Sequence, residues 1–537
     1  MPDLDLIVRR GLVVDGTGSP GATADVGVRG GRVEAVGDLS GAGAARVIEA
    51  AGLAVTPGFI DTHAHSDGAL LLDPQHENGI RQGITTEIIT QDGMGFAPLS
   101  PANYRAYRMY LSGILGFPPL DLDMSSIAAL RSHYHRRAVC NVAVLVPHGA
   151  LRLEAAGFRD VPLRGDLLAR AQSLLRDGLE QGAVGLSTGL SYYPQSYSDT
   201  EELVELCRVV ADHGGVFVVH VRNHNVDRAA AGGGVAEALE IGRRSGVKVH
   251  VSHFKTAPGT AGGVDALMAP IDAAKAAGVD VTLECYPYPV GSTVPGYFLP
   301  GALHDGGPQA LLARLASAEG RATAVEGLRT LFPGALATAC WTHLASEANR
   351  ELEGLSFADA AARRGVSVEE MVCDVMREES LACGFRYIPT DSVATWRRLD
   401  EDVMRLLARD DYMVGSDAIP HGSLPHPRAY GCFPRVLGRL RRRYGVALET
   451  LVERVTSLPA RRFGLRDRGV IAPGAAADIV VFDPERFVDL ATFEDPKAPP
   501  AGLSYAIVNG ALAVDGERCT GVLAGEAVPA GDQAMRG

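Results

Sequence analysis

Lysine is scarce in this sequence, and charge of either sign is never concentrated. Only Lys248, Lys255, Lys275 and Lys497 are lysines among 51 basic residues, and the net charge is −13 at pH 7. A nucleic-acid partner requires a clustered basic surface that neutralises phosphates, so the absence of a basic block argues against one. The same scarcity makes a lysine beside a chemical motif more informative than an arginine at that place.

Paired cysteines, a secretory leader and long apolar runs are also absent. The eight cysteines show no CxxC spacing, which is typical of reduced thiols in a cytosolic protein. The N-terminal MPDLDLIVRRG lacks the basic-then-apolar pattern of a secretory signal. No stretch approaches the roughly 20 apolar residues that cross a bilayer. We therefore expect a cytoplasmic protein that does not bind a membrane.

Short apolar runs alternate with glycine turns at both ends of the chain. ADVGVRGGRVEAVG lies near the N-terminus, and ADIVVFDP and SYAIVNGALAVDG lie near the C-terminus. This pattern predicts short antiparallel strands, and Asn509-Gly510 between two apolar runs predicts a hairpin. The similarity of the two ends predicts one small β-sandwich domain assembled from residues 1–55 and 471–537. Two unrelated β caps are the alternative.

Between these ends, eight apolar runs alternate with helical stretches. Continuous apolar composition is typical of parallel strands covered on both faces, and eight β/α units predict a TIM barrel, an α/β fold, over residues 56–470. The stretch between strands seven and eight is too long for one helix, so residues 290–350 are expected to form an inserted subdomain over the barrel mouth. The runs are TPGFIDTHAH, TTEIITQDG, CNVAVLVPHG, AVGLSTGL, GVFVVHVR, KVHVSHFK, DVTLECYPY and DYMVGSDA.

Histidines stand at the ends of three of these runs, where the active sites of TIM barrels lie. His63 and His65 end the first run, and side chains two positions apart on a strand share one face, so both imidazoles can bind one ion. His220 ends the fifth run and His253 the sixth. A single histidine there is more often a core residue. Four of them at one barrel mouth favour a metal site, and neutral imidazole is the usual zinc donor.

Two aspartates end further runs. Asp92 follows the second run and can reach the same mouth, where a carboxylate can bridge two divalent ions. Asp417 follows the eighth run, opposite His63 and His65, and this position suits a general base for metal-bound water. Each aspartate could instead be a turn residue that caps the following helix.

Longer stretches of the sequence resemble the N-acyl-D-amino-acid deacylases, or D-aminoacylases, of the amidohydrolase superfamily. They run from about residue 55 to the C-terminus. This resemblance implies a metal-dependent hydrolase that splits the amide bond of an N-acyl-D-amino acid, giving a carboxylate and a free D-amino acid. The matching stretches include PGFIDTHAHSD, AVGLSTGLSYYPQSYSDTEEL, VHVSHFK, YPYPVGST, GSDAIPHGSLPHPRAYGCFPRVLG and TSLPARRFGLRDRGVIAPGAAADIVVFDP.

The resemblance also implies a role for each candidate residue. His220 and His253 would hold one tightly bound zinc ion together with a strand-two residue, and His63, His65 and Asp417 would line a second, weaker metal position. Zinc lowers the pKa of bound water to roughly 7, and Asp417 would serve as general base and then as general acid. The substrate carboxylate would be gripped by Lys255, Tyr286 and Arg428.

Two features separate the chain from related enzymes. D-aminoacylases carry a cysteine at the strand-two metal position, where an ungapped comparison places Asp92. A carboxylate is a harder ligand than a thiolate, so it favours a more evenly occupied two-metal centre or another metal. Hydantoinases and dihydroorotases bridge two metals with a carboxylated lysine on strand four. No lysine precedes Lys248 in this chain, so that bridge cannot form.

Three more residues near strand ends are candidates for contacts with the acyl group or for support of the metal ligands. They are Tyr192, Ser292 and His148. For His148, a purely structural role is an equal alternative.

The expected partner is a small N-acylated amino acid, and a homo-oligomer is left open. Two rival functions also stay open. One is a cyclic-amide or imide hydrolase or a deaminase, and the other is a metal-binding barrel without catalysis.

Overall fold

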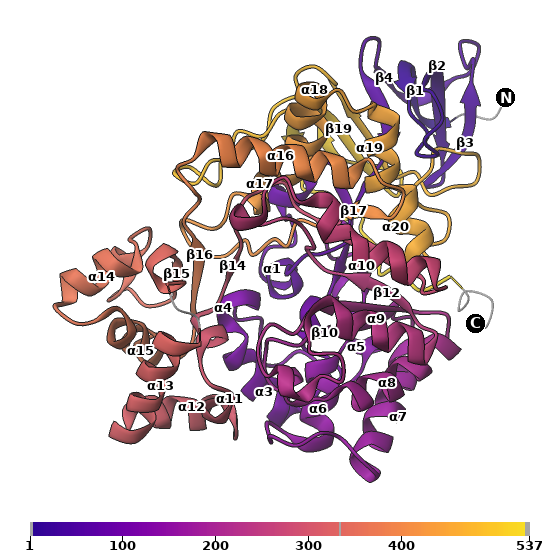
Figure 1. Cartoon of the computed structure of the whole chain (residues 1–537). Helices are drawn as coiled ribbons and strands as arrows, with labels where there is room; N and C mark the ends of the chain where they lie inside the picture. The colour runs from indigo at the N-terminus through magenta and orange to yellow at the C-terminus, as the bar shows by residue number, and fades with distance from the viewer. Residues whose placement is uncertain (1–3, 332–333, 532–537) are drawn as a thin grey trace.

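Eight buried stretches form the parallel strands of a barrel, in their order along the chain (Figure 1). The structure is a computed structural model that describes residues 4–331 and 334–531. Each predicted apolar run contains one barrel strand, with the third run divided into two short segments. These strands are β6 (Phe59–Asp61), β7 (Ile84–Ile89), β8 (Asn141–Val144) with β9 (Val146–Pro147), β10 (Gly185–Gly189), β11 (Val216–His220), β12 (Lys248–Val251), β13 (Val281–Cys285) and β17 (Tyr412–Val414).

The barrel closes between its first and last strands. Ala64 and Ala418 form a parallel bridge just beyond β6 and β17. The Thr62 N–H donates to the Val414 carbonyl at 3.4 Å, and the Asp417 N–H donates to the His63 carbonyl at 2.7 Å. Closure therefore brings residues more than 350 positions apart to one end of the barrel, and the predicted TIM-barrel class is confirmed.

Helices pack around the outside of the strands and are amphipathic, as predicted. In α8 (Thr200–Asp212), the Asp199 side chain accepts from the N–H of Glu202 and so caps the helix, while Leu203, Leu206 and Val210 are buried. The other helices around the barrel also pack their apolar faces against the strands. They include α7 (Asp166–Glu180), α9 (Gly234–Ser245), α10 (Val264–Ala276), α16 (Val393–Leu407) and α19 (Leu448–Val455).

Strands from both ends of the chain form one small β unit, as the sequence predicts. β18 pairs with β5, which joins the C-terminal strands to the N-terminal ones, and β1 pairs with β4 along its first half and β5 along its second. Asn509 and Gly510 form the predicted turn between β19 and β20 with positive φ angles of 48° and 81°. The strands are β1 (Leu4–Val13), β2 (Ala22–Arg29), β3 (Arg32–Gly37), β4 (Ala44–Glu49), β5 (Ala54–Pro57), β18 (Ile479–Phe482), β19 (Leu503–Val508), β20 (Ala511–Asp515) and β21 (Arg518–Cys519).

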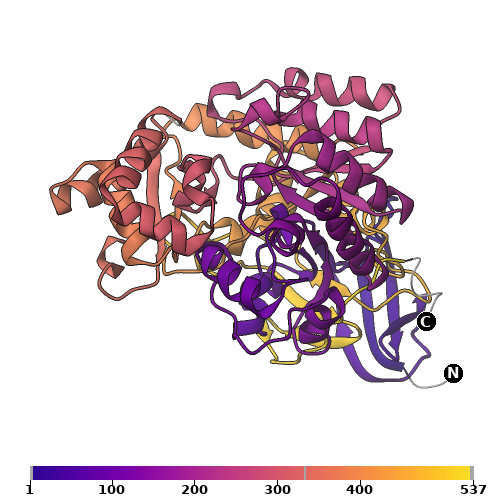
Figure 2. The same ribbon diagram turned by 90° about the horizontal axis from the view of Figure 1, so that it is seen from below.

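A separate lobe lies between β13 and β17 and projects from the barrel in both views (Figures 1 and 2). It has its own core, which extends from Phe298 to Phe385. The lobe thus continues past the range 290–350, because β16 returns to pair with both β14 and β15. Its elements are β14 (Ser292–Thr293), α11 (Gly301–His304), α12 (Pro308–Ala316), α13 (Ala318–Thr330), β15 (Ala339–Leu344), α14 (Phe357–Arg364), α15 (Val368–Glu378) and β16 (Cys383–Tyr387).

No helix among the described residues is both long and apolar enough to cross a membrane. The eight cysteines are free thiols, and all but Cys519 are buried. This matches the reduced state that their spacing predicts.

A buried ion pair joins two helices of the barrel wall. Arg152 lies on α6 (His148–Ala156) and Glu202 on α8, and the Arg152 Nη1 atom lies 2.6 Å from each carboxylate oxygen. Glu202 also contacts His148 Nε2 at 2.9 Å and accepts the Leu163 N–H at 2.7 Å. Burial alone would raise the pKa of Glu202, but Arg152 and His148 lower it to about 2.

We expect Glu202→Gln to lower the free energy of unfolding by about 3–5 kcal/mol, because it leaves the Arg152 charge buried without a counter-charge. The pKa of Glu202 falls from 4.5 to about 2 on folding. The stabilisation is therefore complete above about pH 4.5 and disappears as the pH falls towards 2. Thermal unfolding of the wild-type protein and of Glu202→Gln between pH 7 and pH 3 measures how the difference between their stabilities shrinks as the pH falls. Glu201→Gln is the matched control, since Glu201 is exposed beside Arg244; equal losses in both variants would contradict the prediction.

Candidate metal centre

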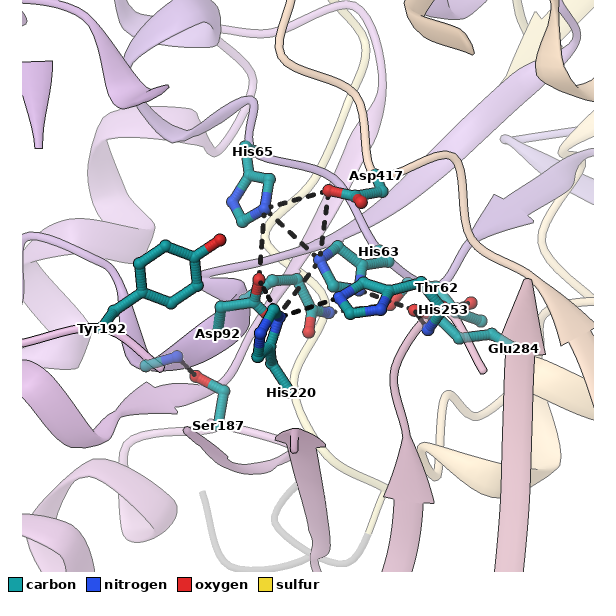
Figure 3. Close-up of polar contacts among 12 residues, drawn as sticks. Thr62, His63, His65, Asp92, Ser187, Tyr192, His220, His253, Glu284 and Asp417 are labelled. Carbon is teal, nitrogen blue, oxygen red and sulfur yellow. Dashed lines mark hydrogen bonds and ion pairs between the residues drawn. The ribbon is translucent and has the colours of Figure 1, made fainter. Parts of the chain in front are cut away.

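Six side chains meet at the carboxyl end of the barrel (Figure 3). They come from five strands: two histidines follow β6, one ends β11 and one follows β12, while the aspartates follow β7 and β17. Five of them are buried, and His253 is half-buried. The structure thus brings together every residue that the sequence proposes as a metal ligand: His63, His65, Asp92, His220, His253 and Asp417.

The donor atoms of this cluster lie at the separations that a shared metal ion requires. His63 Nε2 is 3.4 Å from His65 Nε2, and His65 Nε2 is 3.3 Å from Asp417 Oδ1. Asp92 Oδ2 is 3.6 Å from His65 Nε2 and also 3.6 Å from His220 Nδ1. Two atoms that each lie about 2.0–2.2 Å from one tetrahedral ion are about 3.3–3.6 Å apart. The geometry therefore fits a divalent metal.

Two overlapping triads can each hold an ion. His63 and Asp417 belong to one triad with His65, and His63 and Asp92 belong to the other with His253. Asp92 Oδ1 is buried and has no hydrogen-bond donor among the described residues, a costly arrangement for a carboxylate that a cation would relieve. His220 Nδ1 lies 3.0 Å from His253 Nε2 and extends the second group. The residues thus fit one or two zinc ions.

Proton affinities differ between the members of the cluster. Burial would lower the pKa of both His63 and His65, but Glu284 and Asp92 raise that of His63 to about 10, and Asp417 and Asp92 raise that of His65. Zinc would therefore displace protons from these two imidazoles.

Burial would raise the pKa of Asp417, but Arg428, His65 and His63 lower it well below its usual value, so this carboxylate is ionised. Asp92 is held ionised in the same way by His63 and His220. Burial, aided by His220, lowers the pKa of His253 to about 4 and keeps that imidazole neutral. Ionised carboxylates and neutral imidazoles are the forms that bind zinc.

Glu284 is a functional residue that the sequence does not reveal. It lies on β13, is fully buried, and contacts His63 Nδ1 through Oε1 at 2.6 Å. The same oxygen accepts the His253 N–H at 3.2 Å, and Oε2 accepts the Thr62 hydroxyl at 2.5 Å. Glu284 thereby fixes the ring of His63 with Nε2 facing the cluster. An acid inside the apolar run DVTLECYPY is the only signal that could have identified it.

Glycine at position 415 leaves room for this carboxylate. Gly415 follows β17, which lies between β13 and β6 around the barrel. A Cβ atom on Gly415 would lie 1.9 Å from Glu284 Oε2 and 2.7 Å from the Cβ atom of His63. Any other residue would therefore displace the Glu284–His63 contact.

Three of the six cluster residues have left-handed backbone conformations. The φ angles are 56° for Asp92, 37° for His253 and 53° for Asp417. Such conformations cost free energy in residues other than glycine and accumulate at functional sites. They also break the alternation of side chains along a strand, so His253 points to the cluster from beyond the end of β12.

A cavity of about 130 Å³ opens above the cluster. Among the residues proposed for substrate contacts, Tyr192, Tyr286 and Ser292 line it. The Tyr192 hydroxyl contacts Thr293 Oγ1 at 2.8 Å, and its ring packs edge-on against His220 at 5.1 Å between centroids. These side chains are in position to contact a small molecule at the metal centre.

Lys255 and Arg428 both contact the ring of Tyr286. Lys255 Nζ lies 4.7 Å and the Arg428 guanidinium carbon 4.6 Å from the ring centroid. Lys255 also donates to the Tyr288 carbonyl at 2.7 Å, and Arg428 Nη1 lies 2.7 Å from Asp417 Oδ2. Two cations thus lie beside the cavity, and one of them contacts the proposed base.

His148 does not reach the cavity. Its Nε2 atom contacts Glu202 and its Nδ1 atom contacts the Thr188 hydroxyl at 2.9 Å. Because β9 ends at Pro147, His148 belongs to the first turn of α6 and its ring points between helix and strand. The geometry therefore assigns His148 to the packing of α6 on α8, the structural alternative that the sequence leaves open.

Known proteins resemble this chain over most of its length. The model of the amidohydrolase family matches residues 46–253 and 380–514, and the gap holds most of the projecting lobe together with α10 and β13 of the barrel. An N-acyl-D-glutamate deacylase of Alcaligenes xylosoxydans xylosoxydans is 38% identical over 94% of this chain and 93% of its own length. A D-aminoacylase of the same organism is 34% identical over 97% of this chain and 96% of its own length.

A solved structure gives the same result. The N-acyl-D-glutamate deacylase of Bordetella bronchiseptica, complexed with zinc and a phosphonate mimic of the reaction's tetrahedral intermediate, superposes with a TM-score of 0.81 at 33% identity. The match covers 98% of this chain and 100% of that one. The likeness therefore extends over the barrel, the β unit and the lobe.

We expect Glu284→Gln to weaken zinc binding about 10- to 100-fold, because a neutral amide holds the His63 ring less firmly than a carboxylate. Competition with a chromophoric chelator measures the affinity. Glu87→Gln is the matched control, since Glu87 is a buried strand glutamate that contacts His76 instead. Gly415→Ala should mimic Glu284→Gln in zinc affinity. Unchanged affinity in both would show that His63 does not depend on Glu284.

Proposed function

This chain belongs to the amidohydrolase family, and we propose that it hydrolyses the amide bond of N-acyl-D-amino acids to a carboxylate and a free D-amino acid. The observation that carries the proposal is the convergence of four imidazoles and two carboxylates on one cavity. Relatives that share almost the full length of the chain are deacylases of N-acyl-D-amino acids, which supports this reaction over others in the family.

We assign one tightly held zinc ion to His220, His253 and Asp92, and a second position to His63, His65 and Asp417. When bound, the metal polarises the scissile carbonyl and makes water acidic enough to attack at neutral pH. The chain's own residues fix the positions of the reacting groups, because Glu284 orients His63 and the strand ends hold the other donors. Barrel closure thus preorganises the site before the substrate arrives.

Asp417 is the proposed general base and acid. Its Oδ1 atom faces the cluster, 3.3 Å from His65 Nε2, and the residue lines the cavity. As an ionised carboxylate it can accept the proton of the attacking water and then deliver it to the leaving amine nitrogen. A neutral amine departs far more readily than an amide anion, so this transfer completes the cleavage.

The rival reactions lack such support. Hydantoinase-type centres use a lysine on strand four, whereas β10 has the sequence GLSTG. Lys255 and Arg428 beside the cavity favour a substrate that carries a carboxylate. A metal-binding barrel without catalysis would also need an ionised Asp417 as a ligand, so the turnover of the Asp417→Asn variant is what separates that rival from the proposed enzyme. That the chain binds neither nucleic acid nor a membrane stays a prediction from the sequence, and a homo-oligomeric state stays open.

We expect the zinc-loaded protein to hydrolyse N-acetyl-D-amino acids but not their L-enantiomers, dihydrouracil or cytosine. Asp417→Asn should lower kcat by between about 100-fold and 10,000-fold while the zinc ion assigned to His220, His253 and Asp92 stays bound, because the amide cannot carry the proton. Amine release and metal analysis measure both quantities. Asp410→Asn, at an exposed position seven residues earlier, is the control. Full turnover by Asp417→Asn would refute its role.

We expect Lys255→Met to lower kcat/KM for an N-acetyl-D-amino acid by about 10- to 150-fold, the effect of losing one charge-assisted hydrogen bond. Burial lowers the pKa of Lys255 to about 8, with Arg428 adding to the effect, so the ammonium group is still present at pH 7. The corresponding substrate amide, which has no carboxylate, should be affected little. Lys248→Met, whose ammonium group is exposed near Gly214, is the control. Equal losses for acid and amide would contradict a carboxylate contact.

A further inference from the structure

His426 is a buried histidine that the proposed function does not use. It lies between β17 and α17 (Arg428–Pro434), two residues before Arg428. The ring of His426 is enclosed by other aromatic rings, with centroid distances of 5.3 Å to Tyr288 and 5.1 Å to Phe493. The residue does not line the metal-site cavity, so any effect on the reaction must pass through its neighbours.

The two ring nitrogens of His426 make different hydrogen bonds. Nδ1 accepts the N–H of Arg428 at 3.1 Å, and Nε2 lies 3.1 Å from the Val290 carbonyl. A backbone N–H only donates and a carbonyl only accepts, so Nε2 carries the proton and Nδ1 does not. Burial, with Arg428 adding to the effect, lowers the pKa of His426 well below its usual value and keeps the ring neutral. A single tautomer therefore satisfies both partners.

The N–H of Arg428 needs an acceptor from outside its helix. Arg428 is the first residue of α17, and the N–H groups of a first turn have no partner within the helix. Pro427, at the capping position, has no side-chain acceptor. His426 supplies one two residues before Arg428, as asparagine and aspartate do in Asx turns. It thereby fixes the backbone from which the Arg428 side chain extends.

The other nitrogen of His426 holds the wall of the cavity. Val290 precedes Gly291 and Ser292, which both line the cavity. Arg428 Nη2 donates to the Ser292 carbonyl at 3.2 Å, so this wall is joined twice to the segment before α17. A Cβ atom on Gly291 would lie 3.9 Å from Arg428 Nη1. The glycine thus brings the guanidinium close to the cavity.

The C-terminal part of the chain supports the ring of His426. Phe493 lies between β18 and β19, outside the barrel, and packs edge-on against His426. The Phe493 carbonyl accepts from Arg386 Nη2 at 3.2 Å, and the Arg386 guanidinium stacks on the Phe493 ring at 4.9 Å. Lobe and C-terminal segment therefore meet at Phe493 and close off the side of His426 that faces away from the barrel.

We propose that His426 is a positioning residue for recognition of the substrate carboxylate. It holds Arg428 and the cavity wall at Val290 in the relative position that the α-carboxylate requires, and it touches no reacting atom. The inference rests on the proposed deacylase function and adds a residue to its substrate recognition. Misplacement of a binding group by about 1 Å can lower turnover about 100-fold.

The first test replaces His426 in the zinc-loaded protein. His426→Phe keeps the ring packing and removes both hydrogen bonds, whereas His426→Asn keeps an acceptor for the N–H of Arg428. We expect kcat/KM for an N-acetyl-D-amino acid to fall about 10- to 100-fold in His426→Phe, mainly through KM, and to fall much less in His426→Asn. The α-amide of the same substrate has no carboxylate, and both variants should hydrolyse it at the wild-type rate.

His304→Phe is the matched control for this test. His304 is also buried, its Nδ1 contacts the Tyr110 hydroxyl at 2.8 Å, and its ring stacks on Tyr193. The ratio of kcat/KM for acid and amide should keep its wild-type value in this variant. Wild-type kinetics in folded His426→Phe, or equal losses for acid and amide, would overturn the inference and leave the deacylase function intact. Failure of the zinc-loaded wild type to hydrolyse any N-acetyl-D-amino acid would instead refute the proposed function.

The second test loosens the ring without a substitution beside Arg428. Phe493→Leu should lower the acid-to-amide ratio of kcat/KM by about 2- to 10-fold, the equivalent of one aromatic edge contact. Phe487→Leu is the control, since Phe487 lies in the same segment and packs on Phe482 instead. An unchanged ratio in Phe493→Leu, or the same change in both variants, would show that the packing of His426 does not position Arg428.

Discussion

The hydrogen bond between Glu284 and His63 is the contact on which the metal centre depends. It links β13 to β6 across β17, and it exists only because position 415 has no side chain. By accepting from the Thr62 hydroxyl and the His253 N–H as well, Glu284 ties the ligands of two strands together. A buried carboxylate is costly unless its lone pairs are satisfied, and here each of its oxygens has a partner. The same contacts that stabilise the charge also position the metal donors.

The barrel and the ligand set could be predicted because both follow from periodicity. Apolar runs locate the strands, and polar residues at their carboxyl ends must face one another once the barrel closes. His63, His65 and Asp417 are identified in this way without any knowledge of distances. Glu284 escapes this reasoning because it lies within its strand. Its role appears only when the register of β13 against β17 and β6 is known.

Other features depend on packing that the sequence does not express. His148 follows a strand end like the true cluster residues, but the chain turns directly into α6, and Glu202 on α8 attracts its ring. The lobe extends beyond residue 350 because β16 completes a sheet with strands before and after the first lobe helices.

In the proposed mechanism, the contact between Arg428 and Asp417 would couple substrate recognition to catalysis. An arginine 2.7 Å from the carboxylate makes Asp417 a firmly ionised but weak base. A substrate carboxylate that bound Arg428 would compete with Asp417 for the guanidinium and so return basicity to it. Cleavage would then be favoured when an α-carboxylate is present, and the base would stay restrained when the cavity holds water alone. Both cations, Arg428 and Lys255, contact the ring of Tyr286, which lines the cavity, so they lie beside the space that the substrate would occupy.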